Sequence, residues 1–242
     1  MLALIDADIP IYRVGFTSET DPIEVATQKL DEMMEGILEA TKATKYRAFL
    51  TATNDLSNFR RRVFPAYKAN RIGKPKPVHY AALRKHLEDE WNAEVVYGIE
   101  ADDALGIHQT PESVVISVDK DLLQIQGRHY NFVKDLWYDI TPEEGSRRFY
   151  AQMITGDASD NIKGVPRKGE VAAMKALDGI NDDETMFGIV YDLYQEAFGS
   201  DLEMFRNGLC LWVLRHQNDS YAIHWEDHMA VREGFRDDSS DN

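Results

Sequence analysis

Short apolar runs alternate with amphipathic stretches along much of this chain, and acidic residues directly follow the apolar runs. The first run, Leu2–Ile5, is followed by Asp6, and the strongest, Ser113–Val118, is followed by Asp119. Apolar residues at helical spacing occupy the stretch between Ile23 and Thr41. This alternation of strands and helices predicts an α/β fold, with a mostly parallel sheet and helices on both of its faces.

The carboxyl ends of parallel strands meet at one edge of a sheet, and ligand sites in such folds lie beyond that edge. Two further predicted strands, 46–51 and 95–97, are followed by Asp55 and Glu100. We therefore expect both acids to lie near Asp6, at the same edge of the sheet.

The densest acidic stretch is Glu100-Ala101-Asp102-Asp103, at the predicted start of a helix. Acids are favoured in a first helical turn, so this stretch alone is also compatible with an ordinary solvated helix start. On a helix, Glu100 and Asp103 share one side, whereas Asp102 projects about 100° away from Asp103. One short stretch can therefore supply ligands to two neighbouring ions.

Three more acid pairs occur at predicted element ends: Asp6 with Asp8, Asp119 with Asp121 and Asp157 with Asp160. Each pair has helix capping as its simpler interpretation. So many acids in one site would repel one another unless cations neutralised them. Carboxylates without clustered His or Cys favour Mg²⁺ or Mn²⁺, and two such ions ~4 Å apart suit phosphodiester hydrolysis.

The charge of the chain is unevenly distributed. Its formal net charge is −15 at pH 7, whereas nucleic-acid-binding domains are usually basic. From Arg60 to Leu87, however, there are nine Lys or Arg residues and no Asp or Glu, with aromatic residues between them. This segment suits contacts with a phosphate backbone and stacking on bases, and a solvated basic face is the alternative.

The turn Gly164-Val165-Pro166-Arg167-Lys168-Gly169 joins two predicted helices. Turn amides and a helix start can hold a phosphate, or a monovalent cation such as K⁺ against one. Arg167 and Lys168 add positive charge, so we expect DNA contacts here, with an ordinary helix connection as the alternative.

Other features bound the compartment. The single cysteine, Cys210, allows neither an intrachain disulfide nor a Cys-based zinc site, which suits a reducing cytoplasm. Acids interrupt the first apolar run, so a signal peptide is not expected. No run approaches the ~18 apolar residues of a membrane-spanning helix.

Five stretches, in the same order, resemble the 5′-nuclease superfamily, which includes the exonuclease domain of bacterial DNA polymerase I, flap endonucleases and phage 5′→3′ exonucleases. They are L-A-L-I-D-A-D (2–8), N-F-R-R-R-V-F-P-A-Y-K-A-N-R (58–71), E-A-D-D-A-L-G (100–106), S-V-D-K-D-L (117–122) and G-D-A-S-D-N-I-K-G-V-P-R-K-G (156–169). The segment after Arg71 is too short for a long helical clamp, which points to a phage-type exonuclease.

The resemblance implies a PIN-like nuclease core over residues 1–140, with a basic arch segment at 58–78. A helical DNA-binding part would follow over 141–236, with a helix–three-turn–helix motif at about 153–177. Residues 237–242 would form an acidic tail.

The resemblance also implies roles for individual residues. The first metal would be bound mainly by Asp6, Asp55, Glu100 and Asp102, and the second mainly by Asp103, Asp119, Asp121, Asp157 and Asp160. Asp102, Asp119, Lys68 and Arg71 would be catalytic, the two cations at the scissile phosphate. DNA contacts would come from Arg60, Lys68, Arg71, Gly164, Arg167, Lys168 and Gly169.

Two positions depart from the pattern of the superfamily. Many relatives have an Asp directly at the end of the second strand, where this chain has Thr51 or Thr53, and Asp55 is the expected substitute. Asp8 stands where many relatives carry a small or amide residue, which leaves its role as a ligand open.

The expected activity is metal-dependent 5′→3′ exonuclease hydrolysis of duplex DNA in replication or recombination, with flaps and RNA–DNA hybrids as further candidate substrates. The setting would be the cytoplasm of a bacterial host of a phage, with replication proteins as candidate partners. One alternative is a haloacid-dehalogenase-type phosphatase with Asp6 as nucleophile, since that family also uses D-x-D and G-D-x-x-D. The other is a DNA-end-binding protein without catalysis.

Overall fold

The computed structural model describes residues 1–239, which form two compact units. The first consists of Met1–Phe59, Arg71–Thr141 and Val213–His216, and the second of Arg60–Asn70, Pro142–Trp212 and the chain from Gln217 onward. Residues 60–70 of the predicted arch segment therefore belong to the second unit. Positions 240–242 of the predicted acidic tail lie outside the described residues.

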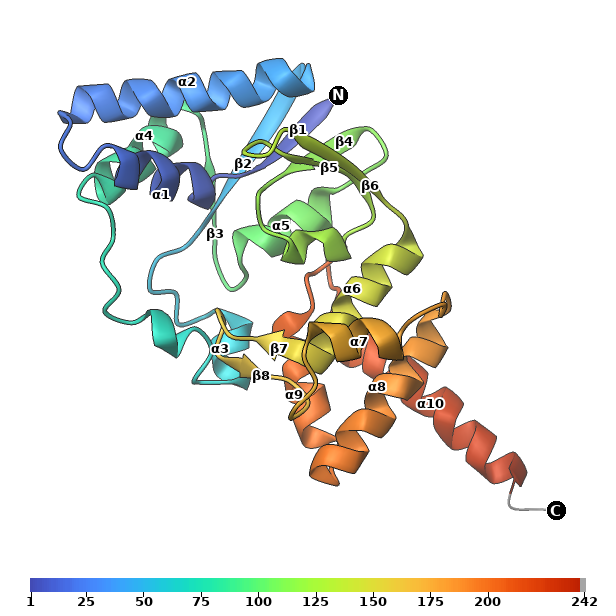
Figure 1. The fold of residues 1–242 in the computed structure, drawn as a ribbon. Helices are drawn as coiled ribbons and strands as arrows, with labels where there is room; N and C mark the ends of the chain where they lie inside the picture. Colours follow the sequence, from blue (N-terminus) through green and yellow to red (C-terminus); the bar gives the residue numbers. More distant parts are fainter. Residues whose placement is uncertain (240–242) are drawn as a thin grey trace. The chain divides into compact units, whose positions relative to one another are not determined.

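The first unit is built on a six-stranded sheet with strand order β3-β2-β1-β4-β5-β6 (Figure 1). Neighbouring strands are parallel except β5 and β6, which pair antiparallel. The prediction of a mostly parallel sheet is confirmed. The strands are β1 (Leu2–Asp6), β2 (Lys45–Thr51), β3 (Glu94–Val96), β4 (Ser113–Ile116), β5 (Gly127–Asn131) and β6 (Leu136–Ile140).

Helices cover both faces of this sheet, as expected (Figure 1). Alternate side chains of a strand point to opposite faces, so Ile5 packs with α1, α2 and α4, whereas Leu4 packs with α5. The elements beside the strands are α1 (Asp8–Thr17), α2 (Ile23–Thr41), η1 (Ala69–Arg71), α4 (Tyr80–Glu90), α5 (Ala101–His108) and η2 (Asp121–Gln124). Of these, η1 lies at the boundary between the units.

Helix α1 is absent from the sequence-based expectations. Asp8 begins this helix and does not continue the first strand. An acid suits the first turn, and Pro10 is tolerated there because first-turn N–H groups have no partner within the helix. Asp6 and Asp8 therefore belong to two different elements.

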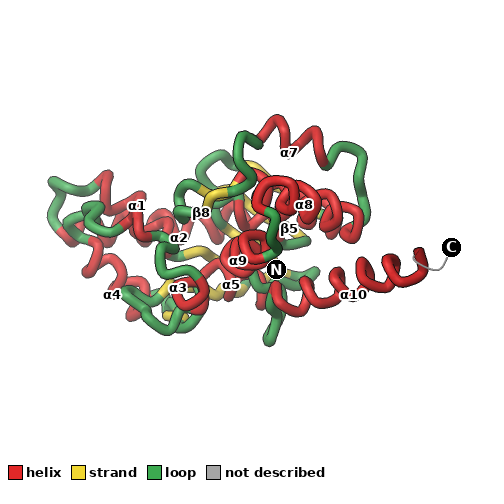
Figure 2. Tube along the Cα trace, turned by 90° about the horizontal axis from the view of Figure 1, so that it is seen from below, coloured by secondary structure: helices red, strands yellow, loops and turns green. Residues whose placement is uncertain are grey.

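The second unit is helical apart from a two-stranded hairpin, and its helices α7, α8, α9 and α10 are drawn in red in Figure 2. Helix α6 packs against α7, α8 and α9, and α10 packs against α9. The elements are α3 (Phe59–Val63), which starts at the boundary, α6 (Pro142–Thr155), β7 (Gly156–Asp157), β8 (Ile162–Lys163), α7 (Glu170–Ala176), α8 (Asp183–Phe198), α9 (Leu202–Leu211) and α10 (Tyr221–Ser239).

The end of α9 corrects a sequence-based expectation. Helical spacing predicts a helix from Leu202 to His216, but the helix ends at Leu211. The backbone of Trp212 is extended, and Val213 packs into the core beneath the sheet of the first unit. Tertiary packing therefore overrides the local periodicity. No described helix combines the length and the apolar character that crossing a membrane requires.

Candidate metal centre

Asp6 is the last residue of β1 and is 4% exposed. The Ser117 hydroxyl donates a hydrogen bond of 2.8 Å to its Oδ2 atom. Burial, followed by the charges of Asp8 and Asp119, raises the pKa of Asp6 to about 7 despite that hydrogen bond. Near neutral pH a proton therefore competes for a carboxylate that a cation would otherwise neutralise.

Asp8 lies near Asp6 but is held by partners of its own. The backbone N–H of Thr51 donates to its Oδ2 at 2.9 Å, and Nη1 of Arg84 lies 3.5 Å from Oδ1. Burial raises the pKa of Asp8, as does the charge of Glu100, whereas the hydrogen bonds of Thr51 and the charge of Arg84 lower it. Arg84, a cation of the predicted DNA-binding segment, is thus buried beside an acid.

The acidic start of α5 contains a capping box, in which Glu100 and Asp103 accept each other's backbone N–H groups. Oδ2 of Asp103 accepts from Glu100 N at 2.9 Å, and Oδ1 accepts from Leu214 N at 3.1 Å. Asp103 is fully buried, whereas Asp102 is partly exposed. Both oxygens of Asp103 thus fix backbone, which favours a positioning role over the predicted role as a metal ligand.

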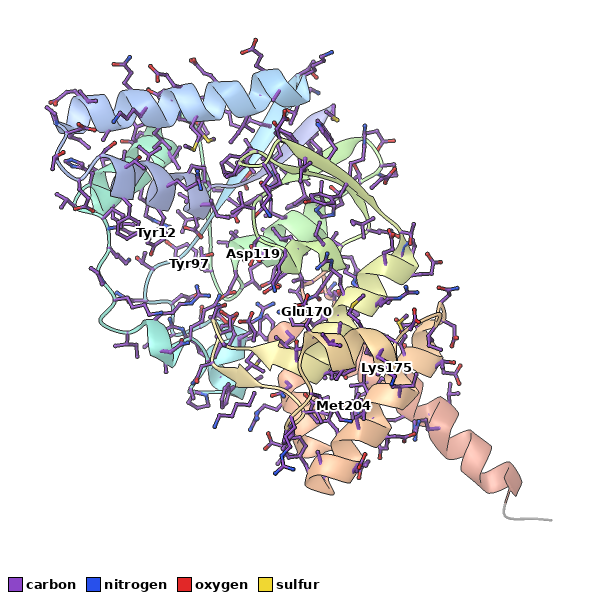
Figure 3. The ribbon with its side chains drawn as sticks, in the orientation of Figure 1. Tyr12, Tyr97, Asp119, Glu170, Lys175 and Met204 are labelled. Atoms are coloured by element: carbon purple, nitrogen blue, oxygen red, sulfur yellow. The ribbon has the colours of Figure 1, made fainter. Side chains whose placement is uncertain are left out.

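The loop after β4 connects Asp119 to Asp6. Ser117 Oγ, which donates to Asp6, also accepts from the backbone N–H of Asp119 at 3.0 Å. Asp119 Oδ1 accepts from Asp121 N at 2.9 Å, and the Asp119 side chain is exposed at this end of the sheet (Figure 3). Ser117 therefore positions the loop that carries both predicted ligands.

Asp55 lies in the loop after β2, and its carboxylate holds two loops together. Oδ1 accepts from the N–H and the hydroxyl of Ser57 at 2.8 and 2.5 Å, and Oδ2 accepts from Gly98 N at 2.6 Å. Gly98 has a φ of +78°, which glycine adopts at little cost. A metal at Asp55 would have to compete with these hydrogen bonds.

The first unit thus brings Asp6, Asp8 and Asp119 within electrostatic reach of one another, with Glu100 close to Asp8. The described residues contain no trio of these acids whose oxygens all lie within 4.8 Å of one another. The buried, mutually repelling oxygen donors nevertheless fit a hard divalent cation, which would offset the repulsion that opposes closer approach.

Local sequence patterns do not reveal the residues that position these acids. In the sequence, Ser117 stands out only as part of the motif S-V-D-K-D-L, and Thr51 only as a departure from the family pattern. The Thr51 hydroxyl accepts from Ala101 N at 3.0 Å, which ties the end of β2 to the start of α5. A small polar residue next to a strand end is the one signal that could have indicated them.

In the second unit, the loop that contains Lys68 packs against the loop of Asp157 and Asp160. Tyr67 donates a hydrogen bond of 2.8 Å to Asp160 Oδ2, and Lys68 Nζ lies 3.7 Å from the same oxygen. The N–H of Lys68 donates to the Asp160 carbonyl at 3.0 Å, and Asn70 donates to the Ala158 carbonyl at 2.7 Å. The motifs at 58–71 and 156–169, which are far apart in sequence, therefore contact each other through these hydrogen bonds.

Asp157 supports the turn between β7 and β8. Its Oδ1 accepts from the N–H groups of Ser159 and Asp160 at 2.6 and 3.3 Å, and Gln152 donates to its Oδ2 at 3.3 Å. Capping of the local backbone, the simpler interpretation of Asp157, therefore accounts for the contacts of its Oδ1 atom.

Arg60 corrects the sequence-based expectation of a phosphate contact. Its side chain is 2% exposed, and its guanidinium donates to the carbonyls of Cys210 and Trp212 at 2.8 and 2.6 Å. An arginine so placed satisfies the end of α9, where carbonyl groups have no helical partner. The run of cations in the sequence predicts contacts at the surface. It gives no sign that the carbonyl groups at the end of α9, which is distant in sequence, need a hydrogen-bond donor.

The turn 164–169 exposes Arg167, Lys168 and Gly169. Gly164 packs closely: a Cβ at this position would lie 2.3 Å from the nitrogen of Gly156. Gly164 therefore allows the hairpin to form, and the exposed cations beside it remain available for a ligand. Arg71 is exposed. It belongs to the first unit, whereas Lys68 belongs to the second.

Residues 1–154 match the family model described as "5′-3′ exonuclease, N-terminal resolvase-like domain". A 5′-3′ exonuclease from Buchnera aphidicola is 28% identical over 221 residues, which cover 81% of this chain and 76% of the relative. The thermostable DNA polymerase I of Thermus caldophilus is 29% identical over 198 residues, 72% of this chain but 23% of the polymerase. The chain thus spans about a quarter of that polymerase.

Solved structures have the same fold. The 5′-exonuclease of bacteriophage T5 with bound zinc has a TM-score of 0.67 at 17% identity, with 87% of this chain and 88% of the other covered. A complex of the T5 flap endonuclease with DNA and metal ions has a TM-score of 0.65 at 18% identity, with coverage of 87% and 89%.

Proposed function

Because this chain belongs to the 5′-3′ exonuclease family, we propose that it is a metal-dependent exonuclease that hydrolyses phosphodiester bonds from the 5′ ends of duplex DNA. The observation that carries the proposal is the set of acids at the carboxyl edge of the sheet, with Asp6 buried at its centre. The family match does not favour the alternative of a haloacid-dehalogenase-type phosphatase. The acids at this edge of the sheet disfavour the alternative of a DNA-end-binding protein without catalysis.

Two divalent ions, Mg²⁺ or Mn²⁺, would supply a water of lowered pKa and stabilise charge on the attacking and leaving oxygens. Glu100, Asp102, Asp119 and Asp121 are the proposed ligands, together with Asp6 once it has lost its proton. Asp103 would act by holding the start of α5, and Ser117 by orienting the Asp119 loop. The roles of Asp55, Asp157 and Asp160 as ligands stay predictions.

Cations of both units are the proposed DNA contacts. Lys68 and Arg71 are proposed to bind the scissile phosphate, and Arg167 and Lys168 the duplex, with the turn backbone at Gly164 and Gly169 beside them. K⁺ at this turn stays a prediction. The T5 neighbour described as a flap endonuclease in complex with DNA supports flaps as a further substrate. RNA–DNA hybrids, replication partners and a bacterial cytoplasm also stay predictions.

The test of this proposal is digestion of a duplex labelled at either its 5′ or its 3′ end, with Mg²⁺ or with a chelator. We expect small labelled products early from the 5′-labelled strand, progressive shortening of the 3′-labelled strand, and no product with the chelator. Early release of small products from the 3′ label, or equal digestion with the chelator, would contradict the proposal. A phosphomonoester tested in parallel should not be hydrolysed.

A further inference from the structure

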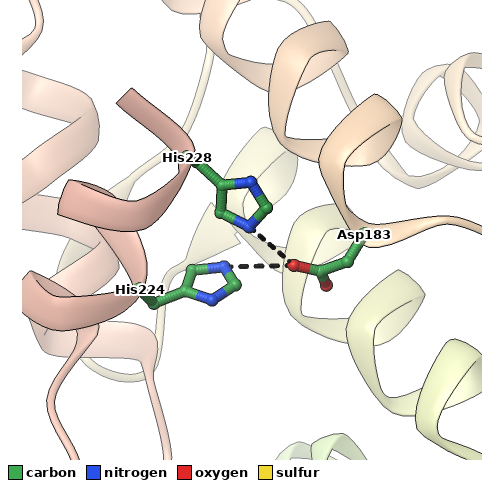
Figure 4. Close-up of side chains that lie close together, drawn as sticks. All are labelled: Asp183, His224 and His228. Carbon is green, nitrogen blue, oxygen red and sulfur yellow. Dashed lines mark hydrogen bonds and ion pairs between the residues drawn. The ribbon is translucent and has the colours of Figure 1, made fainter. Parts of the chain in front are cut away.

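A second group of potential metal ligands lies in the second unit, on elements that carry none of the nuclease acids. Asp183 is the first residue of α8, and His224 and His228 lie four residues apart on α10 (Figure 4). One ligand atom from each of the three residues lies within 4.8 Å of the other two. Among the described residues, this is the one group of three that meets this criterion.

The distances are close to those that a metal requires. Nε2 of His228 lies 2.8 Å from Oδ2 of Asp183, and Nε2 of His224 lies 3.4 Å from the same oxygen. With metal–ligand distances of about 2.0–2.2 Å, ligand atoms of a tetrahedral zinc site are about 3.4 Å apart. Because residues four apart on a helix share one side, both imidazoles face Asp183 without distortion of α10.

Neighbouring side chains hold these ligands in place. The ring of Phe187 stacks on His228 with centroids 4.6 Å apart, and the ring of Trp212 lies 4.7 Å from that of His224. The Tyr150 hydroxyl is 2.8 Å from Nε2 of His224 and 3.2 Å from Oδ2 of Asp183. The packed rings fix the orientation of both imidazoles, and the Tyr150 hydroxyl, whose contact with Nε2 of His224 a metal would replace, stays next to Asp183.

We propose that Asp183, His224 and His228 bind one transition-metal ion of the zinc class, which fixes α10 to the start of α8. Two imidazole nitrogens select Zn²⁺ or Co²⁺ over Mg²⁺, which prefers oxygen ligands. Three protein ligands leave one coordination position for water, with the Tyr150 hydroxyl beside it. The site is distinct from the acids of the nuclease centre, whose donors are all oxygen.

The experiment is a Co²⁺ titration of the full chain followed by visible absorption, with Mg²⁺ in large excess to occupy the oxygen sites. Imidazole-ligated Co²⁺ of low coordination number absorbs visibly, whereas Co²⁺ on oxygen ligands alone absorbs weakly. We expect one absorbing Co²⁺ per chain, and loss of this band in His224→Gln and in His228→Gln. Glutamine keeps an N–H donor for Asp183, so these variants remove the imidazole and retain the hydrogen bond.

His86→Gln is the matched control, because His86 also contacts an acid, Asp31, at 2.7 Å but belongs to no group of three potential ligands among the described residues. It should keep the wild-type Co²⁺ band. A second measurement is the midpoint of thermal unfolding with Mg²⁺ present. Zn²⁺ at about a hundred times its dissociation constant should raise the midpoint of the wild type by about 5 °C or more. It should raise that of the double variant His224→Gln/His228→Gln much less.

Two results would overturn the proposal. One is wild-type protein without a visible Co²⁺ band up to millimolar Co²⁺. The other is a double variant that shows the wild-type band and the same Zn²⁺-dependent rise of the midpoint. Circular dichroism and Mg²⁺-dependent nuclease activity, which the variants should retain, establish that they are folded.

Discussion

Asp6 combines burial and charge repulsion with a proposed role as a metal ligand. It ends β1, lies beside the charges of Asp8 and Asp119, and receives one hydrogen bond from Ser117. Its pKa of about 7 lies above the 3.8 of an ordinary aspartate. Between these two pH values, Asp6 keeps its proton in the folded metal-free chain and loses it in the unfolded chain. Metal binding and protonation are therefore competing ways to neutralise this group.

The sign of the pH dependence follows from that shift. A raised carboxyl pKa stabilises the folded state at low pH, and this stabilisation is lost as pH rises from about 4 through about 7. Without metal, the stability of Asp6→Asn relative to wild type should therefore grow by about 3 kcal/mol between pH 5 and pH 8. Urea unfolding in a chelator measures this difference.

Saturating Mg²⁺ should remove the advantage of Asp6→Asn at pH 8, because the wild-type carboxylate then has a cation. The exposed acid Asp139 provides the control, and Mg²⁺ should leave the stability of Asp139→Asn relative to wild type unchanged. An advantage of Asp6→Asn that is the same at pH 5 and pH 8 would show that Asp6 has an ordinary pKa.

Arg60 and Arg61 are neighbours that differ in environment. Arg60 is buried and donates to two backbone carbonyls, whereas Arg61 is exposed. Arg60→Ala should lower the free energy of unfolding by about 2–4 kcal/mol because buried acceptors lose their donors, and Arg61→Ala should change it by less than about 0.5 kcal/mol. Chemical denaturation compares the two. Unchanged stability with weaker DNA binding in Arg60→Ala would restore the phosphate contact expected from sequence.

At the scale of elements, the start of α5 separates two neighbouring acids by role. Asp103 accepts two backbone N–H groups and is fully buried, whereas Asp102 is partly exposed on the same turn. The capping box orients the helix end, and the partly exposed Asp102 is the acid of this turn that we propose as a metal ligand.

Asn substitutions should distinguish these roles. Asp103→Asn should lower the free energy of unfolding by about 1–3 kcal/mol, because its NH₂ group replaces an acceptor oxygen opposite a backbone N–H. Asp102→Asn should leave stability nearly unchanged and weaken Mg²⁺ binding. Denaturation curves and Mg²⁺ titrations measure both effects, and the opposite pattern would assign the metal to Asp103.

The hairpin between α6 and α7 depends on a close approach of backbone to backbone. A Cβ on Gly164 would lie 2.3 Å from the backbone of Ile154 and of Gly156, whereas one on Gly169 would meet nothing within 4 Å. We expect Gly164→Ala to cost at least about 2 kcal/mol in thermal or chemical unfolding, and Gly169→Ala less than about 1 kcal/mol. Equal costs would mean that the hairpin relaxes freely.

Elements with strong local signals could be predicted from the sequence. The apolar runs Leu2–Ile5 and Ser113–Val118 indicated β1 and β4, and the helical spacing between Ile23 and Thr41 indicated α2. The termination of α9 at Leu211 could not be predicted, because the cause is packing of Val213 in the first unit. Helix α10 was missed as well, since its periodicity is weak and its packing partners lie elsewhere.

At the scale of the molecule, the acids and cations of the family motifs are divided between two units. The first unit contains the acidic edge of the sheet, and the second contains Lys68 with Asp157 and Asp160. The proximity of Asp6 and Asp119 follows from the expectation that parallel strands end at one edge of the sheet, whereas a position of Asp55 beside them stays a prediction. The hydrogen-bond partners of Arg60, Asp103 and Asp55 could not be predicted. Each of these side chains forms a hydrogen bond with the backbone of a segment that is distant in sequence.

The proposed nuclease activity depends on metals bound by acids at the carboxyl edge of the sheet. Its most direct test is Mg²⁺-dependent release of label from 5′-labelled duplex by Glu100→Gln and Glu112→Gln. Glutamine keeps the capping acceptor at 100, and Glu112 is an exposed acid before β4. We expect Glu100→Gln to lower turnover by about 100-fold or more with little loss of stability, and Glu112→Gln to match wild type. Wild-type turnover by folded Glu100→Gln would contradict it.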